Sequence, residues 1–225
     1  MKNRRIDKLK DTFTEQTLLT TALDTLRAEK HPGQSLRCPS KLTQKQTKLA
    51  DEAAQAFPDN FEIRLRLAIY YARSYKSATG INNDRKALSL YAQAYALAPD
   101  NIRLNMEYGR LLIKNQNFVA AENCFIRCLQ LEGLKSHPLT RLGYTYEKWA
   151  SHITDTESKR TLEKLSLLCF KKSYQINSTH KLAEPDLRRS ENTLGETRDL
   201  EIDWAEYEEY TKEHAELPPI DVQPN

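Results

Sequence analysis

Basic side chains at helical spacing, followed by a tyrosine, are the groups in this sequence best suited to bind a ligand. Arg103 and Arg110 lie seven residues apart, so on a helix they share one stripe, about 10 Å apart along the axis. Lys114 follows Arg110 by four residues and continues the stripe. Guanidinium groups bind phosphate or carboxylate, and Tyr144 offers a ring for stacking. The pattern therefore indicates an anion-binding surface.

Metal binding and catalysis have little support from the other reactive residues. Cys124 and Cys128 have the i, i+4 spacing of a possible metal pair. Cys124 recurs as Cys169 in a matching run, which favours a packing role for these small side chains. No Gly-rich phosphate loop, serine elbow or HExxH motif occurs. We expect no metal, no cofactor and no enzyme activity. The histidines are scattered without ligand spacing: His31, His137, His152, His180 and His214.

The composition favours a helical intracellular protein. The 34 basic and 31 acidic residues leave a net charge of +3, too small by itself to indicate a nucleic-acid binder. Segment 199–216 is strongly acidic, so the remainder is more basic than the total suggests. No run of about 18 apolar residues predicts a membrane span, and no signal peptide is expected. The cysteines lack a disulfide framework, so we expect a cytoplasmic location.

Residues of like type recur at a fixed interval, which indicates a repeat architecture. Ala87 and Ala121 lie 34 residues apart. The same interval separates four further pairs: Tyr91 and Phe125, Ala94 and Cys128, Pro99 and Gly133, and Gly109 and Gly143.

The spacing within a repeat predicts a packed helix. Ala87, Tyr91 and Ala94 lie at i, i+4 and i+7, on one helical face. The small residues let a neighbouring helix approach, and the aromatic ring fills the gap between them. Pro99 ends the helix, and Asp100-Asn101 supply turn and N-cap chemistry for the next one.

These residues resemble the tetratricopeptide repeat. In that family a helix A carries Leu-Gly-x-x-Tyr, as Leu142-Gly143 and Tyr146 do here. A helix B carries Ala-x-x-x-Phe-x-x-Ala, as Ala121, Phe125 and Cys128 do. The resemblance implies an all-α fold, a right-handed helical solenoid of about four helix pairs with a C-terminal capping helix.

The resemblance divides the chain into three parts. Residues 1–60 are expected to form a degenerate N-terminal helix pair and cap. Residues 61–180 are expected to hold three repeats, with insertions between the two helices near Ser77–Asn83 and near Ser151–Lys159. Residues 181–225 are expected to form an acidic capping helix and a disordered tail. The repeats are 61–101, 102–135 and 136–180.

A narrower resemblance is to the interferon-induced proteins with tetratricopeptide repeats. Segment 142–146 reads Leu-Gly-Tyr-Thr-Tyr, an irregular basic insertion is expected over 153–160, and a long helix B is expected over 162–176. Segments 68–71 and 86–101 follow the same order around an insertion. The resemblance implies a cytosolic antiviral protein that binds the 5′ ends of single-stranded RNA.

The tetratricopeptide resemblance also implies which helix A positions line a concave groove. Residues 65, 106 and 140 are Leu, Met and Thr, so a clamp for the acidic tails of chaperones is not expected. An ordinary solvated helix face is the alternative interpretation. The predicted groove residues are Arg73, Arg103, Arg110, Lys114, Tyr144 and Lys148.

Two functions follow from this groove. One is a non-enzymatic scaffold for a protein or peptide partner of anionic character. The other is a single-stranded RNA-binding antiviral effector, which would use the same cations. No membrane partner is expected. Whether the acidic helix predicted over 199–216 plugs the groove is left open, as are the partner's identity and the oligomeric state.

Overall fold

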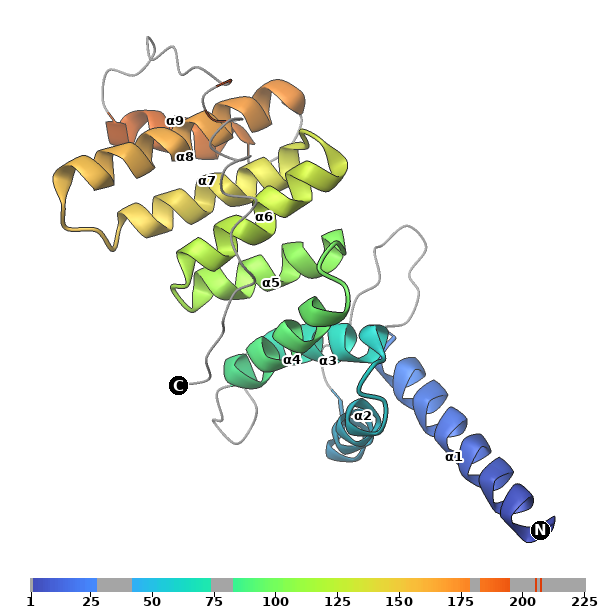
Figure 1. Cartoon of the computed structure of the whole chain (residues 1–225). Helices are drawn as coiled ribbons and strands as arrows, with labels where there is room; N and C mark the ends of the chain where they lie inside the picture. The colour runs from blue at the N-terminus through green and yellow to red at the C-terminus, as the bar shows by residue number, and fades with distance from the viewer. Residues whose placement is uncertain are drawn as a thin grey trace. The chain divides into compact units, whose positions relative to one another are not determined.

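All regular structure in the described part of the chain is α-helical. The computed structural model describes residues 2–27, 42–73, 83–178 and 183–194, together with Ala205 and Tyr207. Within these ranges there are helices and no strands (Figure 1). This confirms the predicted all-α class. None of the helices described is both long and apolar enough to cross a bilayer.

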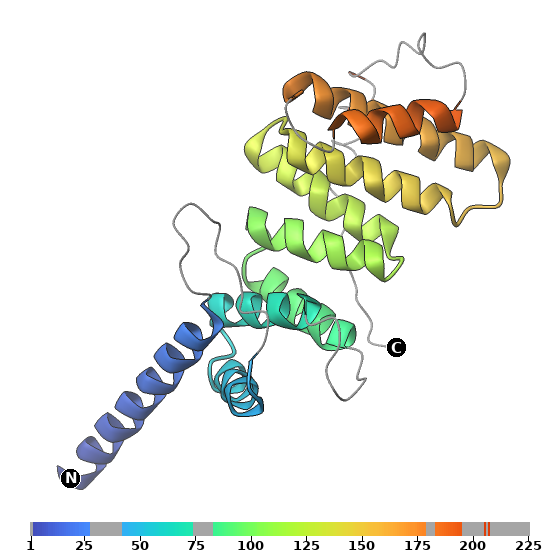
Figure 2. The same ribbon diagram turned by 180° about the vertical axis from the view of Figure 1, so that it is seen from behind.

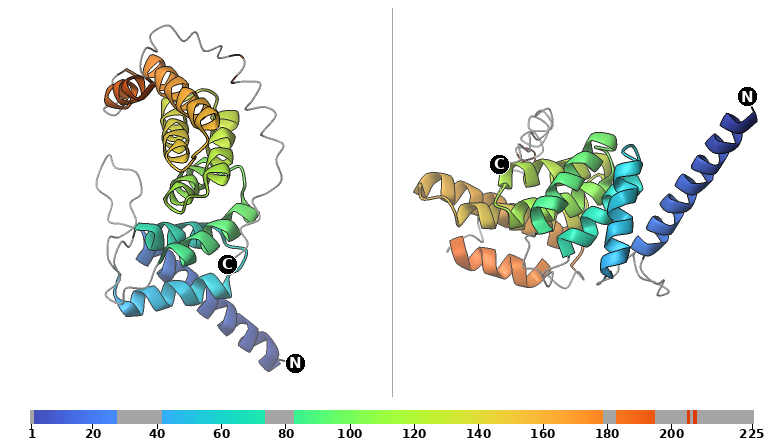
Figure 3. Two further views of the ribbon diagram at one scale, coloured as in Figure 1. Left: turned by 90° about the vertical axis from the view of Figure 1, so that its left-hand side faces the viewer. Right: turned by 90° about the horizontal axis from the view of Figure 1, so that it is seen from below.

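The chain divides into two compact units, one within Met1–Pro99 and one within Asp100–Gln223. The first unit contains α1 (Lys2–Leu26), α2 (Gln44–Ala56), α3 (Phe61–Arg73) and α4 (Asn83–Leu97). Helices α3 and α4 pack as a pair, and α1 and α2 pack against each other and against α3 (Figure 3). Its core includes Ala22, Leu26, Ala50, Ala53, Ile63, Leu67, Ala87, Tyr91 and Ala94.

The second unit contains α5 (Ile102–Lys114), α6 (Phe118–Glu132), α7 (Ser136–Ala150), α8 (Thr156–Ile176) and α9 (Ala183–Leu194). Helices α5 and α6 form one pair, and α7 and α8 form the next. Helix α6 packs on α7, and α9 packs on α8, where the view from behind shows it lying across the α7–α8 pair (Figure 2). Consecutive helices thus contact one another as in a helical solenoid.

Polar side chains begin several helices by accepting hydrogen bonds from otherwise unpaired backbone N–H groups. Thr43 and Gln46 form a reciprocal capping box at α2. Asn101, predicted as an N-cap, accepts a hydrogen bond from the Leu104 N–H at 3.0 Å. Asn117 caps α6 in the same way. These caps place the helix starts close to the turns read from the sequence.

A glycine in helix A faces an aromatic ring in helix B in both repeats of the second unit. A Cβ atom on Gly109 would lie 2.6 Å from Cζ of Phe125. A Cβ atom on Gly143 would lie 2.6 Å from Cε1 of Phe170. Both phenylalanines are fully buried, as is Tyr91 of the first unit. The predicted helix B register is therefore confirmed, and the glycines allow the two helices to approach closely.

The segment after α7 differs from its prediction. The sequence suggested an irregular insertion over 153–160, but α8 already begins at Thr156 and extends for 21 residues, against 15 in α6. The side chain of Asp155 accepts a hydrogen bond from the Ser158 N–H at 2.8 Å and starts the helix. Most of the extra length therefore extends helix B instead of forming a loop.

Several predicted segments lie outside the described residues. These are most of the insertion near 77–83, the tail, and the acidic helix over 199–216 apart from Ala205 and Tyr207. Helix α9 lies in the segment 181–225, ahead of the predicted acidic helix. The division into 1–60, 61–180 and 181–225 stays a prediction.

Candidate binding site on α7 and α9

Tyr144 is the centre of a polar cluster between α7 and α9. Its hydroxyl lies 2.7 Å from both carboxylate oxygens of Asp186 and donates a hydrogen bond to that group. Its ring meets Phe170 edge-on, with 5.4 Å between ring centroids. Burial and the neighbouring Asp186 carboxylate raise the pKa of the Tyr144 phenol. The tyrosine is thus held in one position as a neutral group.

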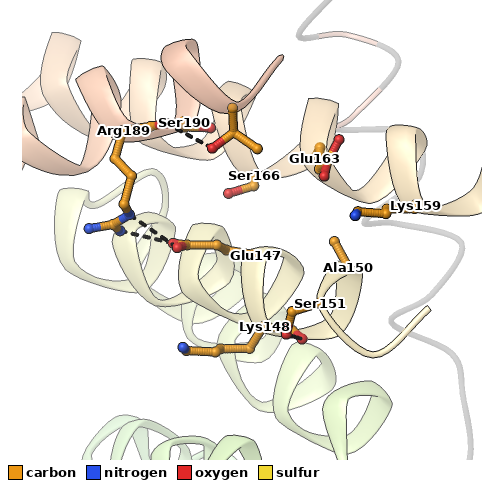
Figure 4. Close-up of a pocket in the computed structure, with 10 residues that line it drawn as sticks. Glu147, Lys148, Ala150, Ser151, Lys159, Glu163, Ser166, Arg189 and Ser190 are labelled. Atoms are coloured by element: carbon orange, nitrogen blue, oxygen red, sulfur yellow. Dashed lines mark hydrogen bonds and ion pairs between the residues drawn. The ribbon is translucent and has the colours of Figure 1, made fainter. Parts of the chain in front are cut away.

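Arg189 ties α9 to α7 through two hydrogen bonds to one carboxylate. Its Nε donates to Oε1 of Glu147 at 3.0 Å, and its Nη2 donates to Oε2 at 2.9 Å (Figure 4). The same Nη2 lies 3.1 Å from Asp186. The guanidinium also lies 5.6 Å from the centroid of the Tyr144 ring. Arg189 is therefore already matched by two carboxylates.

Arg141 is less fully hydrogen-bonded than Arg189. Its guanidinium lies 6.0 Å from the centroid of the Tyr144 ring. Its Nε is buried and has no hydrogen-bond acceptor among the residues described. Burial, and then the charge of Arg110, lower the pKa of the Arg141 guanidinium, while Glu107 and Asp186 act in the opposite direction. An arginine stays charged in proteins, so Arg141 offers a buried donor that lacks an acceptor.

Arg110 extends the cluster onto α5. It is exposed and forms a long ion pair of 3.5 Å with Glu107 on its own helix. Its charge interacts with that of Arg141 on α7. The site thus carries three arginines, Arg110, Arg141 and Arg189, from three helices.

The predicted groove residues fall into separate places. Arg103, Arg110 and Lys114 lie on α5, and Tyr144 and Lys148 lie on α7. Arg73 ends α3 and belongs to the first unit. Of the predicted set, the contacts above involve Arg110 and Tyr144. The groove as a whole stays a prediction.

Sequence reasoning missed Arg141, Arg189 and Asp186. Arg141 precedes Tyr144 by three residues, so helical spacing alone could have placed the two on neighbouring positions. Arg141 is not among the predicted groove residues because the family's groove positions fall on the residues beside it. Asp186 and Arg189 lie on α9, beyond the repeats, where no register was available.

A polar pocket of about 220 Å³ adjoins the cluster between α7, α8 and α9 (Figure 4). Glu147 and Arg189 belong to its wall, and Lys148 and Lys159 add two amines. The Ser166 hydroxyl in the pocket wall donates a hydrogen bond to the Gly143 carbonyl at 2.9 Å, so its proton is already used within the protein. The lining mixes both signs of charge and does not favour one ligand class. The remaining lining residues are Ala150, Ser151, Glu163, Ser190 and Thr193.

The cysteines of α6 are packing residues in the structure. Cys124 and Cys128 are both buried, and burial raises the pKa of both thiols, to about 12 for Cys128. Cys128 donates a weak hydrogen bond to the Ile102 carbonyl, with 3.7 Å between sulfur and oxygen. Within the described ranges no three His, Cys, Asp or Glu residues come together as metal ligands.

Comparison with known families identifies the repeat. A family model described as tetratricopeptide repeat matches residues 85–129, which run from α4 into α6. The chain contains a tetratricopeptide repeat. The matched residues include Tyr91 and Phe125, which are fully buried on the helix B face. Among curated proteins, none matches the sequence at a significant level.

Solved structures similar in fold include two of human IFIT1. They are the dimer with PPP-AAAA and the dimer with m7Gppp-AAAA. Each is 14% identical in sequence, covers 79% of this chain and has a TM-score of 0.41. The chain spans about half the length of these structures, at 47%.

Proposed function

We propose that this tetratricopeptide protein is a non-enzymatic scaffold that binds an acidic segment of a partner protein at Arg141. The observation that carries the proposal is the buried Nε of Arg141, which has no acceptor among the described residues. A buried donor without a partner costs about 1–3 kcal/mol. A carboxylate from a partner would supply the acceptor and recover this energy.

The surroundings of Arg141 suit a peptide side chain. Asp186 and Phe170 hold the Tyr144 ring in place, so it forms a fixed wall beside the guanidinium. A wall that is already ordered lowers the entropic cost of binding. Arg110, exposed on α5, offers a second cation to the same ligand.

The charge balance favours a single carboxylate over a highly charged chain. The three arginines of the site are accompanied by three carboxylates, those of Glu107, Glu147 and Asp186. A ligand with one negative charge would be attracted by Arg141 without strong repulsion from the carboxylates. A nucleic acid carries one negative charge per nucleotide and would be repelled by all three carboxylates. Single-stranded RNA, the alternative from the sequence, is therefore the second candidate, and it would rely on the exposed Arg110, Lys114 and Lys148.

Fluorescence anisotropy with a labelled, C-terminally amidated peptide Ala-Ala-Glu-Ala-Ala, which carries one carboxylate, and with labelled deca-uridine tests the proposal on the full chain. We expect the glutamate peptide to bind, and Arg141→Gln to weaken its binding at least about tenfold, because a hydrogen-bonded charge pair is lost. Arg127→Gln is the matched control, since Arg127 pairs with Asp100 at the start of the unit, and it should leave binding unchanged. Equal binding by Arg141→Gln would refute the site. Binding of deca-uridine alone, falling steeply with salt, would favour the RNA candidate.

A further inference from the structure

Asp186 is a buried carboxylate near the start of α9, at the edge of the site proposed above. Its side chain is 3% exposed. It accepts the hydrogen bond of the Tyr144 hydroxyl, which lies 2.7 Å from both of its oxygens. It also lies 3.1 Å from Nη2 of Arg189 on its own helix. The carboxylate is therefore held in one position by donors that belong to the protein.

The Tyr144 side chain brings Asp186 and Arg141 close together. The Arg141 guanidinium lies 6.0 Å from the centroid of the Tyr144 ring, and Asp186 binds the hydroxyl of the same ring. Burial lowers the pKa of the Arg141 guanidinium, and the charge of Asp186 acts on it in the opposite direction. An anion bound at the Arg141 Nε would therefore also interact with the negative charge of Asp186.

A carboxylate and a phosphate monoester would be repelled by Asp186 to different degrees. A carboxylate carries one negative charge, whereas a phosphate monoester carries close to two at neutral pH. Because Asp186 is shielded from water, its repulsion of a second charge is screened less than that of an exposed residue. An ionised carboxylate also has no proton to donate to the ligand. Repulsive groups of this kind are a common source of binding specificity.

We propose that Asp186 is a specificity-determining residue that makes the Arg141 site select a carboxylate and reject a phosphate monoester. Asp186 has this role only where a ligand binds at Arg141, so the selectivity rests on the proposed function. Arginine alone would not make the distinction, because guanidinium groups bind both kinds of anion. The acidic residue of the partner is thus glutamate or aspartate, and a phosphorylated serine does not replace it.

Isothermal titration calorimetry of the full chain with three peptides tests this selectivity at about pH 7.5, above the second phosphate pKa of about 6. The peptides are acetylated, C-terminally amidated Ala-Ala-X-Ala-Ala, in which X is glutamate, phosphoserine or sulfoserine. Sulfoserine has the tetrahedral shape of phosphoserine but one negative charge fewer. Phosphoserine should bind at least about tenfold more weakly than glutamate, and sulfoserine at least about fivefold more tightly than phosphoserine. Equally weak binding of both tetrahedral groups would show exclusion by shape and would overturn the proposal.

Two matched substitutions on α9 separate the effect of Asp186 from a general change of charge. Asp186→Asn removes the charge but keeps an oxygen that can accept from Tyr144, so it should reduce the preference for glutamate over phosphoserine at least about fivefold. Glu191→Gln removes one charge from another face of the same helix and should leave the preference unchanged. If Asp186→Asn still binds glutamate with the wild-type preference, the role of Asp186 is refuted and the Arg141 site stands. If the wild-type chain does not bind the glutamate peptide, the proposed function itself is refuted.

Discussion

Substituting Gly143 by alanine tests the close contact on which the repeat packing depends. The added Cβ would lie 2.6 Å from Cε1 of Phe170 and 2.8 Å from both Cδ1 and Cζ. Ordinary contacts of this kind are 3.4–4 Å long, so the overlap is at least about 0.8 Å. The ring cannot move into solvent because it is fully buried, and its edge already meets Tyr144.

Two opposing terms set the size of the effect. Overpacking a core costs about 1–3 kcal/mol. Replacing a helical glycine by alanine returns about 1 kcal/mol. Because three ring atoms are involved and none has room to shift, we expect the cost of overpacking to lie in the upper half of its range. The free energy of unfolding should therefore fall by about 1–2 kcal/mol on balance.

Urea unfolding followed by far-UV circular dichroism measures this change. The matched comparison places Gly143→Ala in a Phe170→Leu background, where the smaller side chain leaves room for the new methyl group. The two substitutions should couple by at least about 0.5 kcal/mol, with the alanine costing less beside leucine. If Gly143→Ala is neutral or stabilising, or if its cost is the same beside leucine, the helix contact does not constrain the repeat as argued.

Two further predictions follow from the buried helix B residues. Phe125→Ala should reduce the free energy of unfolding by about 3–5 kcal/mol. The control is Val119→Ala on the same helix, at a residue that is 48% exposed, and it should change the free energy of unfolding little. A loss under about 1 kcal/mol at Phe125 would contradict the helix B register. Alkylation of Cys128 in the folded chain should show no rise near pH 8.5, where ordinary thiols ionise, because burial raises its pKa to about 12; a rate that follows an ordinary thiol titration would contradict its burial.

The sequence by itself determined the repeat and much of the fold. The spacing of Ala87, Tyr91 and Ala94 is a local property of one helix, and its recurrence at Ala121, Phe125 and Cys128 predicted the buried faces correctly. The same holds for Asn101, whose capping role depends on residues three positions away. The insertion expected over 153–160 is wrong from Thr156 onward because the Asp155 side chain caps the helix there and Thr156–Arg160 contains helix-forming residues.

The candidate site was decided by the tertiary structure. Tyr144 meets Asp186 across 42 residues, and Tyr146 meets Tyr207 across 61 residues. No periodicity connects these positions, because α9 and the residues after it lie outside the repeats. The isolation of the Arg141 Nε likewise depends on which neighbours carry acceptors and where they point. Helical periodicity specifies which face of a helix is buried, but the partner of each polar group depends on how distant helices pack together.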